Sequence, residues 1–127
     1  MDLYRDHILD HYKHPRNKGA LHGADAVGEA ANPVCGDRLS FGYKVRNGRI
    51  GEVRFTGEGC AISQAGASLL TELVVGKTVA EAARLPDEAL LKAIGVPLSP
   101  ARLPCGLLAL VALRDAARSS QRKRNPV

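Results

Sequence analysis

The chain has 127 residues, a length that suits one compact domain spanning 1–127 with one hydrophobic core. Hydrophobic residues make up 45% of it and aromatic residues only 4%, so Leu, Val, Ile and Ala must supply most of the core. No apolar run approaches the roughly 18 residues of a membrane span, and the charged start carries no secretory signal. These features predict a cytoplasmic protein that does not enter a membrane.

The net charge of +5 is concentrated at the C-terminal end of the sequence. Arg122, Lys123 and Arg124 supply three of the five excess positive charges. Residues from about 119 to 127 are therefore predicted to form a basic, frayed tail. Such a tail could bind nucleic acid, but no aromatic residues lie among its basic ones, which argues against that partner.

The first predicted element is a helix over residues 2–13, where apolar side chains recur at helical spacing until Pro15 breaks the pattern. His7, His11 and His14 could share one face of this helix and bind a metal ion. The alternative is that they are ordinary surface residues, and this is the interpretation that we favour.

Strands are predicted in the next part of the chain. Apolar residues alternate over 38–45 and again over 50–55, and Asn47–Gly48 between them is typical of a hairpin turn. A short strand before Asn32 would complete a three-stranded antiparallel sheet.

Helical spacing dominates after Cys60. Helices are predicted over about 62–74, over 79–84 with Thr78 and Glu81 as a capping box, over 87–94, and over about 104–118. Because the strands precede these helices, the pattern predicts an α+β fold: a small three-stranded antiparallel sheet packed against several α-helices.

The three cysteines lie at boundaries between predicted elements rather than within them. An odd number of cysteines in a reducing compartment argues against structural disulfides and leaves packing, metal ligation or reactive thiolates. In an extended segment, residues i and i+2 point the same way, so Cys35 and Asp37 can converge on one ion. The alternative for Asp37 is a turn residue that bonds local amides.

Cys60 and Cys105 are each predicted to open a helix, where the helix dipole favours the thiolate form. Three thiolates and one carboxylate would satisfy tetrahedral Zn²⁺ or anchor an iron–sulfur cluster. No Cys-x-x-Cys pair is present, and the residues come from three distant segments, so binding requires the folded domain. We therefore expect Cys35, Asp37, Cys60 and Cys105 to form one metal site.

Three motifs resemble the IscU/NifU/SufU family of iron–sulfur cluster assembly scaffolds: residues 32–37 (NPVCGD), 57–63 (GEGCAIS) and 102–105 (RLPC). The resemblance spans almost the whole chain and implies a SufE/NifU-like α+β fold. It implies that Cys35, Cys60 and Cys105 are cluster ligands or persulfide acceptors, and that Asp37 keeps the cluster labile or ligates zinc.

The resemblance further implies zinc in the purified protein, a transient [2Fe–2S] cluster, a cysteine desulfurase as sulfur donor, and apo iron–sulfur proteins as recipients. The alternative function is a zinc-dependent sulfur acceptor that activates the desulfurase, a sulfurtransferase rather than a scaffold. Pro104 stands where IscU-type members carry His, so Asp37 is expected to be the fourth ligand. SufU-type members carry an insertion for which 60–105 is too short, and 98–102 matches the chaperone-recognition segment of IscU only in part.

Overall fold

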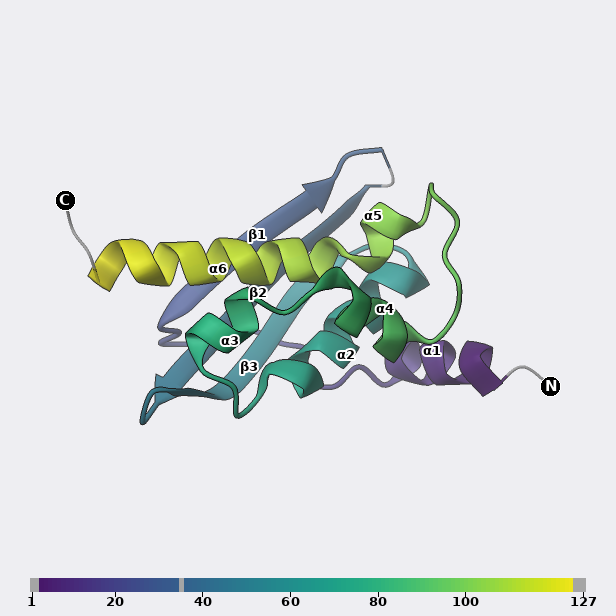
Figure 1. Ribbon diagram of the computed structural model, residues 1–127. Helices are drawn as coiled ribbons and strands as arrows, with labels where there is room; N and C mark the ends of the chain where they lie inside the picture. The colour runs from purple at the N-terminus through teal and green to yellow at the C-terminus, as the bar shows by residue number, and fades with distance from the viewer. Residues whose placement is uncertain (1–2, 35, 125–127) are drawn as a thin grey trace.

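A three-stranded antiparallel sheet carries the helices on one face (Figure 1). The computed structural model describes residues 3–34 and 36–124. In chain order the elements are α1 (Leu3–Lys13), β1 (Ala26–Asn32), β2 (Asp37–Arg46), β3 (Arg49–Glu58), α2 (Ala61–Val74), α3 (Val79–Ala83), α4 (Asp87–Ile94), α5 (Leu103–Gly106) and α6 (Leu108–Arg124). None of the helices in these ranges combines the length and apolar composition needed to cross a membrane. The predicted α+β class is confirmed.

Strand β2 lies between β1 and β3, and its first residue, Asp37, pairs with Asn32 at the end of β1. Asn47 (φ 53°) and Gly48 (φ 78°) join β2 to β3. Positive φ at both central residues is the backbone of a type I′ turn, which matches the twist of the strands. The predicted hairpin and the strand before Asn32 are therefore confirmed.

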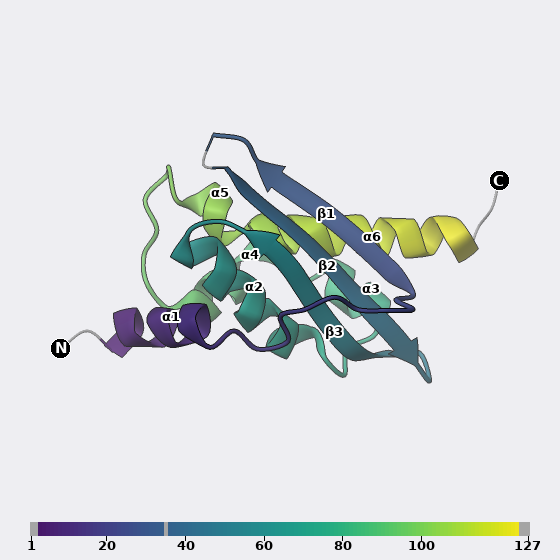
Figure 2. The same cartoon turned by 180° about the vertical axis from the view of Figure 1, so that it is seen from behind.

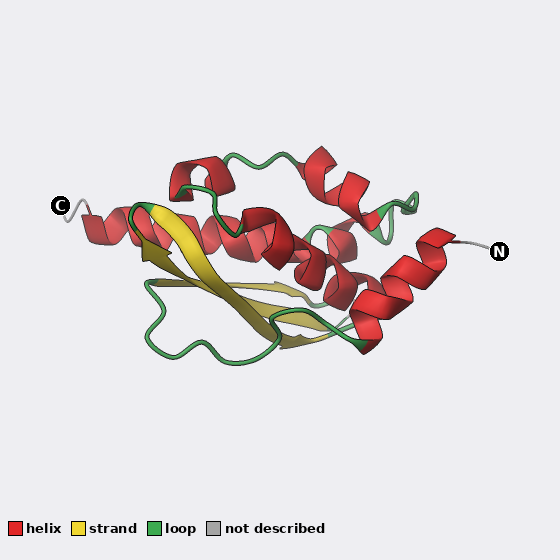
Figure 3. Cartoon of the chain, turned by 90° about the horizontal axis from the view of Figure 1, so that it is seen from below, coloured by secondary structure: helices red, strands yellow, loops and turns green. Residues whose placement is uncertain are grey.

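The core lies between the sheet and the helices, which form a second layer above it (Figure 3). Phe41 and Tyr43 of β2 point into it and are fully buried. Strand β1 packs closely on α6: a Cβ at Gly28 would overlap the carbonyl oxygen of Ala112 and the backbone of Ala116. Glycine at this position lets two backbones touch.

The segment between α1 and β1 runs along the edge of β3 and across the outer face of the sheet (Figure 2). Phe55 donates its N–H to the carbonyl of Asn17 and accepts from the N–H of Gly19, at 3.0 Å and 2.8 Å. These two bonds pair backbone groups on the outer edge of β3 that no neighbouring strand would pair.

The helices after the sheet agree with the sequence except at the end. The capping box is confirmed, since Thr78 Oγ1 accepts from the Glu81 N–H and Glu81 Oε1 accepts from the Thr78 N–H. The single helix predicted over 104–118 is wrong, because the chain forms the short α5 first and begins α6 at Leu108. Helix α6 also continues to Arg124, so residues 119–124 of the expected frayed tail are helical. Arg, Gln and Lys in this stretch favour helix, and residues 125–127 lie outside the described ranges.

Candidate metal centre

Three of the four predicted ligands meet at one end of the sheet, where the start of β2, the start of α2 and α5 come together (Figure 1). One atom each of Asp37, Cys60 and Cys105 lies within 4.8 Å of the other two. Ligand atoms around one zinc ion with Zn–S of about 2.3 Å are roughly 3.8 Å apart. A contraction of about 1 Å would therefore close these three groups around a single ion. Cys35 lies outside the described residues.

Asp37 is buried, with 1% of its surface exposed, and its two carboxylate oxygens have different surroundings. Oδ1 accepts hydrogen bonds from the Cys60 N–H at 2.9 Å and from Ser63 Oγ at 3.4 Å. Oδ2 is buried, and within the described part of the chain it has no hydrogen-bond partner. An unpaired buried carboxylate oxygen costs several kcal/mol, and a cation would offset that cost. This orphaned oxygen shows that the site suits a metal ion.

Cys60 is the N-cap residue of α2, as predicted, with extended backbone angles (φ −70°, ψ 168°). Its side chain makes no capping hydrogen bond, so the sulfur is available for other chemistry. The sulfur therefore lies at the N-terminus of a 14-residue helix. The residue is only partly buried, so a partner molecule can reach it.

Cys105 has a different environment from the one predicted. It is the third residue of α5, which has four residues, and it does not open the long C-terminal helix. The predicted place at the start of the long C-terminal helix is therefore wrong for this thiol. It is almost fully buried, and Asn32 Nδ2 donates toward its Sγ at 3.8 Å. The polar contact to the Cys105 sulfur therefore comes from the side chain of Asn32, whereas the sequence had predicted one from the start of the C-terminal helix.

Ser63 and Asn32 contribute to the site although neither residue type is an expected ligand, and both lie in the quoted motifs. Ser63 is fully buried and its hydroxyl also lies 3.1 Å from the Cys60 carbonyl oxygen. A position three residues after a helix-opening cysteine lies on the same helix face, and this spacing could have identified it. Asn32 could have been found only from its pairing with Asp37 across the sheet.

Gly59 makes this packing possible. A Cβ at residue 59 would overlap both Asp37 Oδ1 and Ser63 Oγ. Only glycine lets the chain pass this close to the carboxylate. The turn before α2 is therefore part of the site.

The predicted surface position of His11 is wrong. Its ring is buried, Nδ1 lies 2.8 Å from Ser68 Oγ, and Nε2 lies 3.7 Å from a carboxylate oxygen of Glu72. Burial, followed by the positive charges of Arg16 and His7, lowers the pKa of His11. His11 therefore ties α1 to α2, away from the metal centre.

Four further polar residues have exposed side chains: His7, His14, His22 and Arg102. The surface position favoured for His7 and His14 is confirmed. Arg102 precedes α5, two residues before Pro104, which lies in the first turn of that helix.

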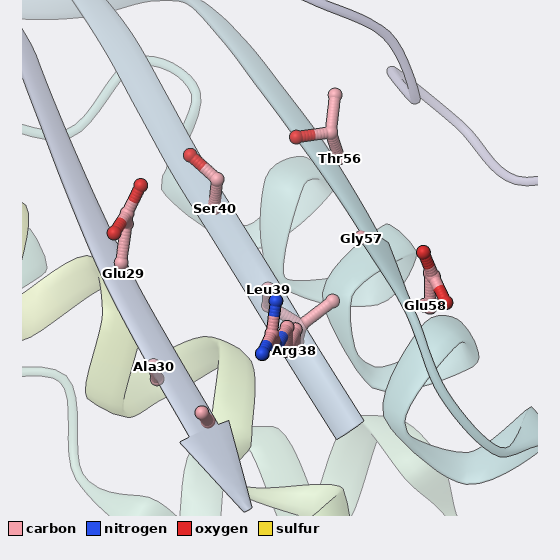
Figure 4. Close-up of a pocket in the computed structure, with 9 residues that line it drawn as sticks. Glu29, Ala30, Arg38, Leu39, Ser40, Thr56, Gly57 and Glu58 are labelled. Carbon is pink, nitrogen blue, oxygen red and sulfur yellow. The ribbon is translucent and has the colours of Figure 1, made fainter. Parts of the chain in front are cut away.

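A groove of about 570 Å³ lies on the outer face of the sheet (Figure 4). The side chain of Arg38, on the central strand β2, is one of the residues that line it. None of the described residues that line it is a cysteine, and it lies on the sheet face opposite to the buried side of Asp37. The groove is therefore distinct from the candidate metal centre. Its lining residues are Glu29, Ala30, Ala31, Arg38, Leu39, Ser40, Thr56, Gly57 and Glu58.

The fold and the site together define a class: an α+β domain that gathers thiols and a carboxylate at one end of a three-stranded sheet. The sequence matches the family described as NifU-like N terminal domain over residues 3–126, and the chain belongs to that family. The resemblance predicted from the three cysteine motifs is thereby confirmed.

Two relatives show how the similarity is distributed. The iron-sulfur cluster assembly scaffold protein IscU 1 of Archaeoglobus fulgidus is 40% identical over 114 residues, covering 90% of this chain and 74% of the relative. The zinc-dependent sulfurtransferase SufU of Bacillus subtilis is 37% identical over 128 residues, covering 87% and 86%. The N-terminal part of a nitrogen-fixing NifU-like protein from Brucella abortus superposes with a TM-score of 0.76 at 25% identity, covering 95% of this chain and 96% of that one. The predicted NifU-like fold is confirmed.

Proposed function

We propose that this protein is a scaffold on which iron–sulfur clusters are assembled and from which they are transferred. The observation that carries the proposal is the convergence of Asp37, Cys60 and Cys105 beside a buried carboxylate oxygen without a partner. Cys35, two residues before Asp37, would complete the set. Membership in the NifU-like family and 40% identity to an archaeal IscU support it.

The site residues would have different roles in cluster assembly, set by their exposure and ligand chemistry. Cys60, partly exposed at a helix N-terminus, is the thiol best placed to accept sulfur from a cysteine desulfurase. Cys105 is buried and would retain the cargo. Asp37 offers a hard oxygen, a weaker ligand than thiolate for an iron–sulfur cluster. One weak position would let the [2Fe–2S] cargo leave for a recipient apoprotein.

Zn²⁺ suits the same residues in the protein as purified, since two thiolates and a carboxylate are ordinary zinc ligands. When bound, zinc would supply charge that keeps the thiols deprotonated. The compartment that we propose is the cytoplasm, where thiols stay reduced. Recognition by a chaperone is not part of the proposal, because 98–102 matches the IscU segment only in part.

Anaerobic reconstitution with iron, cysteine and a cysteine desulfurase tests the scaffold proposal. Cluster absorbance is expected for the unchanged protein and its loss for Cys60→Ser or Cys105→Ser. Asp37→Asn is expected to retain absorbance but to change the transfer rate. Glu58→Gln is the matched control, because Glu58 is an exposed acid at the end of β3. Absence of a cluster, or absorbance indifferent to the cysteine substitutions, would refute the proposal.

A second function, a zinc-dependent sulfur acceptor, is favoured by Pro104, which stands where IscU-type members carry a histidine, and by the similarity to Bacillus subtilis SufU. In this case zinc would hold the thiols until a desulfurase releases one of them. Adding the zinc-loaded protein should then raise desulfurase turnover several-fold, and Cys60→Ser should abolish the stimulation. Unchanged turnover would eliminate this candidate.

A further inference from the structure

Ser63 lies in the first turn of α2, fully buried against the carboxylate of Asp37. Its hydroxyl is 3.4 Å from Asp37 Oδ1 and 3.1 Å from the Cys60 carbonyl oxygen. We propose that Ser63 is a positioning residue, which together with the Cys60 N–H holds Oδ1 so that only Oδ2 faces the metal. The inference rests on the proposed function, since it concerns a metal bound by Asp37.

The two oxygens of a carboxylate are chemically equivalent until their surroundings distinguish them, and either one or both can ligate a metal. Here both donors address Oδ1 and none of the described residues addresses Oδ2. Because Oδ2 is buried, water does not readily replace the missing partner. Oδ1 is therefore used for hydrogen bonds within the protein, and Oδ2 is the oxygen left to bind a metal ion.

Besides the Cys60 N–H and the Ser63 hydroxyl, the backbone of Gly59 also restricts the orientation of the Asp37 carboxylate. The Cα of Gly59 approaches Oδ1 so closely that a Cβ there would overlap both that oxygen and Ser63 Oγ. A rotation of the Asp37 side chain that brought both oxygens to the metal would break the 2.9 Å bond from the Cys60 N–H. The geometry thus favours ligation by a single oxygen.

Loss of the Ser63 hydroxyl would loosen both ends of this arrangement. Its one proton has two acceptors, the Cys60 carbonyl and the Asp37 carboxylate, so it links the backbone of one proposed ligand to the side chain of another. Groups that orient metal ligands from behind typically change metal affinity by about 10–100-fold when they are removed. For Ser63, one of two donors to Oδ1, we expect the lower end of that range.

The experiment measures zinc release to a chromophoric chelator from the zinc-loaded full chain. Ser63→Ala should release zinc roughly 10-fold faster, and Ser63→Thr, which keeps the hydroxyl, should restore the rate. In an Asp37→Asn background Ser63→Ala should add nothing, because Ser63 acts through Asp37. A merely structural role would accelerate release equally in both backgrounds, and that result would overturn the inference.

Co²⁺ substitution provides a readout that global stability does not move. The visible bands of the bound Co²⁺ should differ between Ser63→Ala and the unchanged protein, and should be the same with and without Ser63→Ala in Asp37→Asn. Unchanged bands in Ser63→Ala, or a zinc release rate equal to that of the unchanged protein, overturn the role of Ser63 alone. Failure of the unchanged protein to bind zinc or cobalt would overturn the metal site and the inference together, whereas failed cluster assembly by a protein that passes these tests would overturn only the scaffold.

Discussion

Replacing Gly59 with alanine should destabilise the protein even without metal. The added Cβ would lie closer than 3.0 Å to Asp37 Oδ1 and to Ser63 Oγ, a separation that real Cβ atoms essentially never show. Neither atom is the end of a flexible surface chain, since both residues are almost fully buried. The carboxylate must therefore move, and the bond that it accepts from the Cys60 N–H is lost or weakened.

The size of the effect follows from that bond. A hydrogen bond to a charged group contributes about 1.5–3 kcal/mol, and displacing the buried side chains adds about 1 kcal/mol of overpacking. The reduced entropy of the unfolded chain offsets about 0.4–1 kcal/mol. We expect a net loss of about 2–3 kcal/mol, which for a domain of this size lowers Tm by roughly 10 °C.

Thermal unfolding of the metal-free protein, followed by circular dichroism, measures this loss. Gly51→Ala is the matched control, because residue 51 is an exposed position of β3 where the nearest atoms to a Cβ belong to Arg46 at 3.8 Å. That control should keep the Tm of the unchanged protein or raise it slightly. If Gly59→Ala unfolds at the same temperature as Gly51→Ala, the packing of the carboxylate against the turn is not what this structure indicates.

Three further outcomes follow from contacts outside the metal centre. Gly28→Ala would force β1 away from the Ala112 backbone in α6, so it should cost about 3 kcal/mol or more, seen as a lower urea midpoint; an unchanged midpoint would contradict that contact. The pKa of His11 is lowered below 6.5 in the folded state, so the unfolded chain binds more protons and the free energy of unfolding should fall as the pH drops through 6.5. His11→Asn should flatten this pH dependence between pH 5 and 7.5, and an equal slope in both proteins would contradict the role of His11. Thr78→Ala removes one half of the capping box and should cost about 1 kcal/mol in urea unfolding, whereas no loss would mean that the box contributes nothing.

Local signals in the sequence predicted much of the fold. The turn at Asn47–Gly48 and the cap at Thr78 depend on residues within a few positions of each other, and both are present as expected. The break between α5 and α6 falls at Gly106, a poor helix former, but the apolar residues from Pro104 onward keep helical spacing across it. Its cause is tertiary: Gly106 packs against α2, where a Cβ at Gly66 would lie 3.0 Å from the Gly106 carbonyl oxygen.

The burial of His11 was hidden for a similar reason. Its partner Ser68 is 57 positions away, and the turn of sequence around His11 looks like an exposed helix face. At the metal centre, spacing and element boundaries were enough to expect that Asp37 and the cysteines converge. They could not say which carboxylate oxygen would remain without a partner, because that depends on Ser63 and on the backbone of Cys60.

Asp37 is hydrogen-bonded to the fold through Oδ1, whereas Oδ2 has no partner among the described residues. In the proposed scaffold this combination bears on how a cluster would leave. The side chain of Cys60 makes no capping hydrogen bond. Instead the carboxylate of Asp37, at the start of β2, accepts a hydrogen bond from the Cys60 N–H at the start of α2. Releasing a metal from Oδ2 would leave the Oδ1 contact intact, so the first turn of the helix need not unravel during transfer. Since the same contact keeps the Cys60 backbone in place, the emptied site would retain the arrangement needed for the next round of assembly.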